Sequence, residues 1–396
     1  MTAGPLSGLK VLEASEQIAG PYAGRCLADA GATVVKAEPL GGDAARAWWP
    51  SWRSSSVPFA ALNHGKRSVA LDARADAANP ARSALLAWAD VLISDDGPEA
   101  TGWRPADLDA PAGLVHCVLS GFGGEGPWAG RAWSELAAQL YSEGTSSLGR
   151  PGEAPVRLGT DVASMYAGLY ASQGIAAALL AGEGASDGGG CQVDVSLLGA
   201  MLTMRSTLWV ARSNPEEWWG FHLDNYVKPP FHGYRCKDGL VFFAFRMAAD
   251  LNWDAVVREF GIDWWQDDPR AGIFRQDSIG PASRYGHLVY DLWERAVAPF
   301  TVAEVVAKVE AFGGNAFPML TYRDLLSDEQ MEAVGSLDPS GGVPRVRSPW
   351  RFGGEITRPS RTEVPETGAD WAEVLAEAGL DQAQIGRLRA DGLLGG

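Results

Sequence analysis

The stretch LKVLEASEQIAGPYAGRCLADAGATVVKA, from Leu9 to Ala37, carries two different hydrophobic patterns. Leu9–Ala14 and Ala32–Ala37 are short apolar runs that favour β-strands, and Pro21–Ala30 between them has helical periodicity. A strand, a helix and a second strand in this order form a βαβ unit, in which the two strands are parallel. The stretch therefore predicts an α/β fold.

The same alternation continues outward as far as residue 210. Further strands are predicted at 68–71, 91–94, 114–120 and 192–196, and helices at 80–88, 134–142, 162–181 and 197–210. Strands that alternate with helices specify a mostly parallel sheet with helices on its faces. Residues 1–211 are accordingly predicted to form a large Rossmann-like domain.

A region of different character follows. Tyr234–Phe245 favours a β-hairpin that turns on Lys237-Asp238-Gly239, and helices are predicted at 253–260 and 302–312. These patterns predict a smaller α+β middle domain over residues 220–326. Residues 339–364 are rich in proline, glycine, arginine and serine, which is typical of an extended strap, and two short helices at 371–378 and 382–391 end the range 339–396.

Composition excludes several classes of protein. A chain of 396 residues with 46% hydrophobic residues can bury a substantial core, and its formal net charge of −16 disfavours nucleic acids and anionic lipid surfaces as partners. The sequence has neither a signal peptide nor an apolar run long enough to cross a membrane, which indicates a cytoplasmic protein. The four cysteines and five histidines lack the spacing of metal ligands, so no metal is expected.

A series of short motifs follows along the chain. They are, in order, Leu6–Glu13 with Ala19-Gly20-Pro21; Gly31–Pro39 with Gly41-Gly42-Asp43 and Arg46; Leu62–Asp72; Ser120–Gly123 with Gly126-Pro127; Gly168–Ala171; Gln192–Leu198; and Tyr234–Gly239. In this order and spacing they resemble the family III CoA-transferases, the CaiB/BaiF family, which also includes α-methylacyl-CoA racemases. The resemblance extends over nearly the whole chain.

The resemblance implies an enzyme that takes coenzyme A or an acyl-CoA as substrate and transfers CoA to a carboxylic acid. It also implies that the range 339–396 completes the large domain, and that two subunits form an interlocked homodimer, or a heteromer with a catalytic paralogue. The motif positions that correspond to CoA contacts are Gln17, Ile18, Lys36, Leu71, Arg74, Asp96 and Arg104. Because the phosphates of CoA need local cations in an acidic protein, Arg46, Lys66 and Arg67 are further candidates.

The resemblance also implies a change at the catalytic position. Relatives place a nucleophilic aspartate four residues before the glycine that matches Gly168, and it forms an acyl anhydride and then an aspartyl thioester. The residue here is Ser164, and a serine hydroxyl is a poor nucleophile without a neighbouring base. Asp161 is the nearest carboxylate, and it could either take over this role or cap the helix predicted at 162–181.

The racemases of the family add a His-Asp pair after a Gly-Pro-Trp segment, and the matching pair here is Ser134-Glu135. Three functions therefore stay open. The first is a CoA-transferase that uses Asp161 or another carboxylate. The second is an acyl-CoA epimerase, isomerase or lyase with Glu135 as base and Ser164 as hydrogen-bond donor. The third is a non-catalytic CoA-binding subunit of a heteromeric CoA-transferase. Tryptophans at positions 48, 49, 52, 218 and 219 favour a large apolar or aromatic acyl group.

Overall fold

The computed structural model divides into two compact units, Met1–Arg205 with Gly335–Gly396, and Ser206–Val334. Each unit has a hydrophobic core of its own. The residues that the structure describes are 4–52, 55–75, 80–97, 102–104, 108–145, 154, 156–182, 189–206, 209, 213, 233–245, 252–270, 290–338, 345–357 and 359–396.

The first unit is built on a seven-stranded sheet in the order β16-β5-β2-β1-β6-β7-β8. In the same order, the strands are Leu394–Gly395, Arg67–Leu71, Thr33–Glu38, Lys10–Ala14, Val91–Asp95, Val115–Ser120 and Gln192–Ser196. All neighbouring pairs are parallel except β16 with β5, where Leu394 lies opposite Leu71. The α/β prediction with a mostly parallel sheet is confirmed, and strands from both ends of the chain meet in this sheet.

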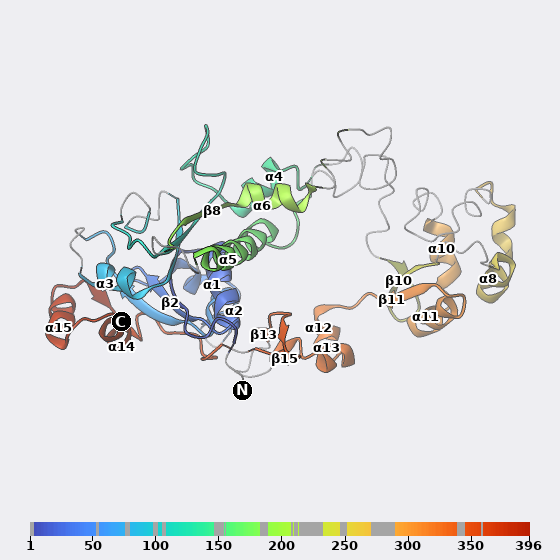
Figure 1. Cartoon of the computed structure of the whole chain (residues 1–396). Coiled ribbons are helices and arrows are strands. Elements are labelled where there is room, and N and C mark those ends of the chain that lie inside the picture. Colours follow the sequence, from blue (N-terminus) through green and yellow to red (C-terminus); the bar gives the residue numbers. More distant parts are fainter. Residues whose placement is uncertain are drawn as a thin grey trace. The chain divides into compact units, whose positions relative to one another are not determined.

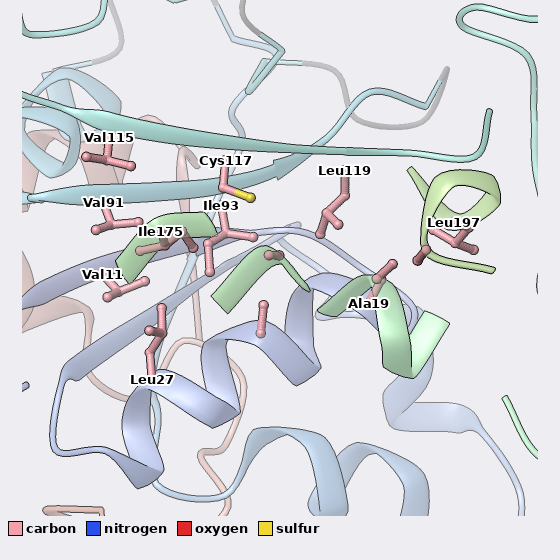
Figure 2. Packing of buried hydrophobic residues seen from close by; sticks show 14 of the residues in the cluster. Val11, Ala19, Leu27, Val91, Ile93, Val115, Cys117, Leu119, Ile175 and Leu197 are labelled. Atoms are coloured by element: carbon pink, nitrogen blue, oxygen red, sulfur yellow. The ribbon is translucent and has the colours of Figure 1, made fainter. Parts of the chain in front are cut away.

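Helices cover both faces of the sheet because both faces are apolar. Val11 pairs with Val34 and Val91, and all three side chains face the layer formed by α1 (Ala19–Asp29), α5 (Val162–Gly182) and α6 (Leu197–Met204). Figure 2 shows Val11 of β1 and Ile93 of β6 in one cluster with Leu27 of α1 and Ile175 of α5.

The next residue along β1, Leu12, points to the opposite face, where α3 (Pro80–Trp88), α14 (Trp371–Glu377) and α15 (Gln382–Ala390) pack. The C-terminal helices therefore lie beside the N-terminal half of the sheet, as the red and blue segments in Figure 1 show. Burying each large apolar side chain in these layers contributes roughly 1.5–3 kcal/mol.

Small residues allow α1 and α5 to approach closely. A Cβ added at Gly168 would clash with the carbonyl oxygen of Ala19, and one added at Gly24 would clash with the carboxylate of Glu13. On α5, Ala163, Ala167 and Ala171 are fully buried against the same neighbour. The close packing of α1 against α5 therefore requires the glycine at position 168.

Several short elements lie in the connections that follow the strands of the sheet. They are the 3-10 helix η1 (Ala44–Ala47), the strands β3 (Ser51–Trp52) and β4 (Ser55–Ser56), and the helices α2 (Val57–Asn63) and α4 (Glu135–Tyr141). Serine residues are the N-caps of both helices. Ser56 Oγ accepts from Phe59 N at 3.2 Å, and Ser134 Oγ accepts from Ala137 N at 3.2 Å. These caps fix the directions in which α2 and α4 leave the turns before them.

The second unit is built on the antiparallel sheet β11-β10-β9, with strands Asn315–Pro318, Leu240–Ala244 and Tyr234–Arg235. The hairpin predicted at 234–245 is confirmed, since Leu240 pairs with Arg235 and Cys236 N donates to Gly239 O at 2.9 Å. The helical elements are α8 (Trp253–Phe260), η3 (Asp263–Asp267), α10 (Tyr290–Val297), α11 (Val302–Ala311), α12 (Tyr322–Leu325) and α13 (Glu329–Ala333). Phe243 and Trp293 lie at the centre of their core.

The strap returns to the first unit as two small hairpins. Their strands are β12 (Leu337–Asp338) with β13 (Arg345–Val346), and β14 (Arg351–Phe352) with β15 (Glu355–Ile356). The strap is held against α1, because Arg25 donates to Val346 O and Ser348 Oγ donates to Asp29 Oδ2 at 2.6 Å. Among the described helices, none combines the length and the apolar character needed to cross a membrane.

Candidate active site

The turn between β1 and α1 lies at the carboxyl edge of the parallel sheet, where α/β folds bind their ligands. Gln17 in this turn has a φ of 63°, a conformation that costs a non-glycine residue free energy. The turn is held to the next strand because Glu16 N donates to Asp95 Oδ2 at 2.8 Å. Ile18 is the N-cap residue of α1. Gln17 borders two pockets, one on each side of the turn.

The first pocket has a volume of about 590 Å³ and lies along the strand ends. It is lined by the last residues of β1, β2, β5 and β6, which are Ala14, Glu38, Leu71 and Asp95, and by Ala37 of β2. The other lining residues are Glu16, Gln17, Pro39, Leu40, Asp72, Ala73, Arg74, Gly97 and Trp103, which follow these strands, and Ala132 and Trp133, which follow β7. Two indole rings beside a cation and several polar groups suit a large, partly aromatic ligand such as a nucleotide.

The negative charge of two of the four carboxyl groups in this pocket is reduced, because Arg46 pairs with Glu38 and Asp95 is partly protonated near neutral pH. Glu38 accepts from Arg46 Nη2 at 2.6 Å and from Ser68 Oγ at 2.5 Å, and these donors hold its pKa below the usual value against the effect of burial. Burial raises the pKa of Asp95 to about 7, although Glu16 N donates to it. Arg74 is exposed at the edge of the pocket and is the cation among its described lining residues.

A buried ion network lies directly beneath the turn. The Lys36 ammonium, which is fully buried, contacts Glu13 Oε1 at 2.9 Å, Asp43 Oδ2 at 2.8 Å and Ser15 O at 2.8 Å. The Lys66 ammonium pairs with the other oxygen of Glu13 and donates to Pro21 O at 2.8 Å. Glu13 and Asp43 raise the pKa of Lys36, whereas burial lowers the pKa of Lys66 to about 8.

Most of the predicted cations have carboxylate partners within the first unit. The ammonium of Lys36 lines neither pocket, because it is used to hold β1, β2 and the turn together. Arg46 is bound to Glu38, Lys66 is bound to Glu13, and Arg67 contacts Glu377 at 2.8 Å. These basic side chains stabilise the scaffold of the pocket, and the sequence gives no signal of their partners because each pair joins different elements.

The second pocket has a volume of about 670 Å³ and lies between α2 and the amino-terminal end of α5. Its lining is mainly apolar, with Ile18, Trp48, Trp49, Pro58, Ala61, Leu62 and Met165 beside Gln17, Glu135, Thr160 and Asp161. Trp48 and Trp49 were predicted to mark an apolar acyl site, and both lie here. The side chain of Trp52, and Trp218 and Trp219, lie outside the described residues.

The three predicted catalytic residues meet at the start of α5. Glu135 Oε1 accepts from Ala163 N at 2.9 Å and Oε2 accepts from Ser164 N at 2.8 Å, while Gln139 Nε2 donates to Oε1 at 2.7 Å. Glu135 thus satisfies the backbone donors of the first turn of the helix. Asp161 lies directly before α5 and its backbone oxygen accepts from Met165 N at 3.0 Å, but the side-chain acceptor for the N–H groups of Ala163 and Ser164 is Glu135 of α4.

Asp161 and Ser164 differ in access to the second pocket. Asp161 lines it, its side chain is 44% exposed, and Arg157 Nη2 lies 3.3 Å from its Oδ1. Burial and the nearby charge of Glu135 raise the pKa of Asp161, which Arg157 partly opposes. Ser164 is only 3% exposed. The side chain at the motif position is therefore covered, and the carboxyl group three residues earlier is accessible.

The remaining predicted contact residues are split between the pockets and their surroundings. Gln17, Leu71 and Arg74 line the first pocket, and Gln17 and Ile18 line the second. Asp96 donates its backbone N–H to Leu119 O at 2.7 Å, and Arg104 follows the pocket residue Trp103. In the described ranges, the linings of the two pockets include neither Asp96 nor Arg104, and no cluster of three His, Cys, Asp or Glu side chains could hold a metal.

Sequence reasoning missed Asp95, Trp103 and Trp133 in the first pocket. The position of Asp95 could have been noticed, because a carboxylate directly after the strand predicted at 91–94 lies at the ligand-binding edge. Trp103 and Trp133 come from loops, whose course has no periodic signal in the sequence.

Comparison with known proteins places this geometry in context. Residues 6–371 match the family model of CoA-transferase family III. A succinate–glutarate CoA-transferase of Agrobacterium fabrum is 29% identical over 94% of this chain and 95% of its own length, and an acetyl-CoA:oxalate CoA-transferase of Acetobacter aceti is 26% identical over 92% and 94%. The crystal structure of a CaiB/BaiF family protein from Brucella suis superposes with a TM-score of 0.78 at 27% identity, and covers 95% of this chain and 100% of that one.

Proposed function

Because this chain belongs to CoA-transferase family III, the CaiB/BaiF family, we propose that it transfers coenzyme A from an acyl-CoA thioester to a carboxylic acid, with Asp161 as the carboxylate of the covalent step. The observation that carries the proposal is the accessible position of Asp161 in the second pocket, beside the turn that also borders the first. CoA would lie in the first pocket, with its thioester near Gln17. Of the predicted CoA contacts, Gln17, Ile18, Leu71 and Arg74 have the position that this requires.

A carboxylate oxygen of Asp161 attacks the thioester carbonyl, the C–S bond breaks, and an acyl-aspartyl anhydride and the CoA thiolate form. The thiolate then attacks the carbonyl carbon of Asp161, which releases the first carboxylate and leaves an aspartyl thioester. The acceptor carboxylate repeats the two steps in reverse, so that a new acyl-CoA leaves and Asp161 is regenerated. This is the chemistry of the family, carried out three residues before its usual position.

Two features of the site support Asp161 over its neighbours. The raised pKa of Asp161 indicates a carboxylate that its surroundings do not strongly stabilise, as a nucleophile requires. Glu135 has each of its oxygens bound to a backbone N–H, so an attack or a proton abstraction by Glu135 would first have to give up the cap of α5. The epimerase, isomerase or lyase alternative is therefore less well supported. A homodimer, interlocked through the strap, is part of the proposal.

Trapping of the covalent intermediate tests the proposal. The protein is incubated with an acyl-CoA, treated with hydroxylamine or borohydride, and digested for peptide mass spectrometry. Adducts are expected on Asp161 in the wild type and in Ser164→Ala, and no adduct is expected in Asp161→Asn. If no variant forms an adduct although all bind CoA, the proposal fails, and copurification with a paralogous chain would then favour the subunit alternative.

A further inference from the structure

We infer that the second pocket selects an acyl group that has an apolar chain and no second carboxylate. The inference rests on the proposed function for the identity of the ligand as an acyl-CoA. It extends that function by naming the chemical class of the acyl group. Its basis is the charge and polarity of the pocket next to Asp161 and Glu135.

The apolar part of the pocket is open to an acyl chain. Leu62 is buried and forms the floor contributed by α2, and Met165 is half-buried on α5. Trp49 is 86% exposed, although it is among the largest apolar side chains in the protein. An exposed indole on the wall of an apolar pocket gains free energy when a hydrocarbon chain covers it. Because Gln17 borders both pockets, a thioester that extends from the first pocket places its acyl chain against this wall.

The charges in the pocket oppose a second carboxylate. Both ionisable groups in its described lining are acidic, namely Glu135 and Asp161. Glu135 is fixed at the start of α5 by backbone donors and cannot turn away without uncapping the helix. A carboxylate on the acyl chain would lose water on entering, and it would meet like charges rather than a cation. Arg157, the nearest basic residue along the chain, pairs with Asp161.

A pair of thioesters of equal chain length and similar size isolates this effect. One is glutaryl-CoA, and the other is the analogue in which an isopropyl group replaces the terminal carboxylate. Calorimetric titration measures the binding of each, with free CoA as the reference for the first pocket. We expect the isopropyl analogue to bind at least about tenfold more tightly than glutaryl-CoA, a difference of about 1.4 kcal/mol. Glutaryl-CoA binding as tightly as the analogue, or more tightly, would overturn the inference.

A substitution at an exposed position provides a second test. Ala61 is exposed on α2 and lines the pocket, so a longer side chain there can be accommodated without disturbing the core. Ala61→Lys supplies the missing cation, and Ala61→Gln is the control of similar size. We expect Ala61→Lys to bind glutaryl-CoA at least about fivefold more tightly than Ala61→Gln does. An equal effect of both variants would also contradict the inference.

These binding results separate the inference from the proposed function. If the expected preference appears but neither an adduct nor CoA transfer is found, the proposed function fails and the inference about the pocket stands. If CoA transfer and an Asp161 adduct are found but glutaryl-CoA is the tighter ligand, the inference fails and the proposed function stands.

Discussion

The carboxylate of Glu135 accepts a hydrogen bond at 2.8 Å from the backbone N–H of Ser164, the residue at the position of the family nucleophile. The contact joins α4 to the first turn of α5 and places a negative charge where the helix dipole favours one. A carboxylate is thus present at the start of α5, but it comes from another helix and acts as a cap. Glu135 and Asp161 both line the second pocket, but both oxygens of Glu135 accept hydrogen bonds from the backbone of α5.

Removal of the Glu135 carboxylate is expected to destabilise the first unit. Glu135→Ala leaves the N–H groups of Ala163 and Ser164 without their acceptor, which costs about 1–3 kcal/mol in the free energy of unfolding. Glu135→Gln retains one acceptor oxygen and should cost less. Denaturant unfolding measures both, with the exposed Glu125→Ala as control. A stable Glu135→Ala protein without activity would instead indicate a purely catalytic role.

Restoring the family residue by Ser164→Asp is expected to produce two carboxylates in close proximity. Repulsion by Glu135 raises the pKa of the introduced group and costs roughly 1–3 kcal/mol of stability at pH 8. A carboxyl group with a raised pKa in the folded state is charged above that pKa, so the cost should decrease as the pH falls to 5. Ser164→Asn should show a similar cost at both values of pH. Unfolding curves that give the same cost for Ser164→Asp at pH 5 and pH 8 would contradict this reading.

Trp49→Ala is expected to weaken the binding of an apolar acyl-CoA while leaving stability nearly unchanged. The side chain is 86% exposed, so its removal opens no cavity in the folded protein. Loss of apolar contact with the acyl chain should reduce affinity roughly five- to twentyfold, with no change for free CoA. Leu180→Ala, which removes a 68% exposed side chain on α5, is the matched control. If Trp49→Ala weakened the binding of free CoA and of acyl-CoA equally, Trp49 would not contact the acyl chain.

Glu13→Gln is expected to destabilise the protein strongly. Glu13 contacts both Lys36 and Lys66, and its neutralisation leaves two buried ammonium groups with too little negative charge, at a cost of about 3–5 kcal/mol. Arg67→Gln is the contrasting control. Its partners Glu373 and Glu377 have side chains that are 77% and 49% exposed, so the expected cost is at most about 1 kcal/mol. Similar unfolding midpoints for the two variants would show that the network contributes little.

Asp95→Asn should stabilise the protein in a pH-dependent way. Burial raises the pKa of Asp95 to about 7 in the folded state, above the value of about 4 expected in the unfolded chain. Between these values the folded state binds the extra proton, so wild-type stability decreases as the pH rises from 4 to 7. Asparagine does not titrate. Its advantage over aspartate should therefore grow by about 1–3 kcal/mol between pH 5 and pH 8, as measured by denaturant unfolding. An advantage that is constant with pH would mean that Asp95 does not titrate in this range.

Much of the fold could be predicted from local patterns. The strand, helix and strand within Leu9–Ala37 appear in the structure as Lys10–Ala14, Ala19–Asp29 and Thr33–Glu38. The long helix predicted at 162–181 is present as Val162–Gly182. Such elements are readable because the period of apolar residues reports directly which side of a helix or strand is buried. The helix predicted at 197–210 is described only as Leu197–Met204.

Site residues were easiest to predict where a motif lies at the end of a predicted strand. Gln17 and Ile18 follow the first strand, so their place at the sheet edge follows from the topology. The ion-pair partners of the basic residues could not be predicted from the sequence. Arg46 binds Glu38, and Lys66 binds a glutamate 53 residues earlier in the chain. A predicted cation is available to a ligand only if no such partner exists, and this depends on how separate elements pack.

The sequence by itself determined the α/β class, the order of most strands and helices along the chain, and the family, because these depend on periodicity and on motifs in a fixed order. Only the tertiary structure decided which carboxylate accepts from the first turn of α5, which cations are buried and which acidic groups line the second pocket. Glu135 lies 29 residues from Ser164, and β16 pairs with β5 from the opposite end of the chain. Contacts of this kind are selected by packing and charge in three dimensions, and a one-dimensional pattern carries no record of them.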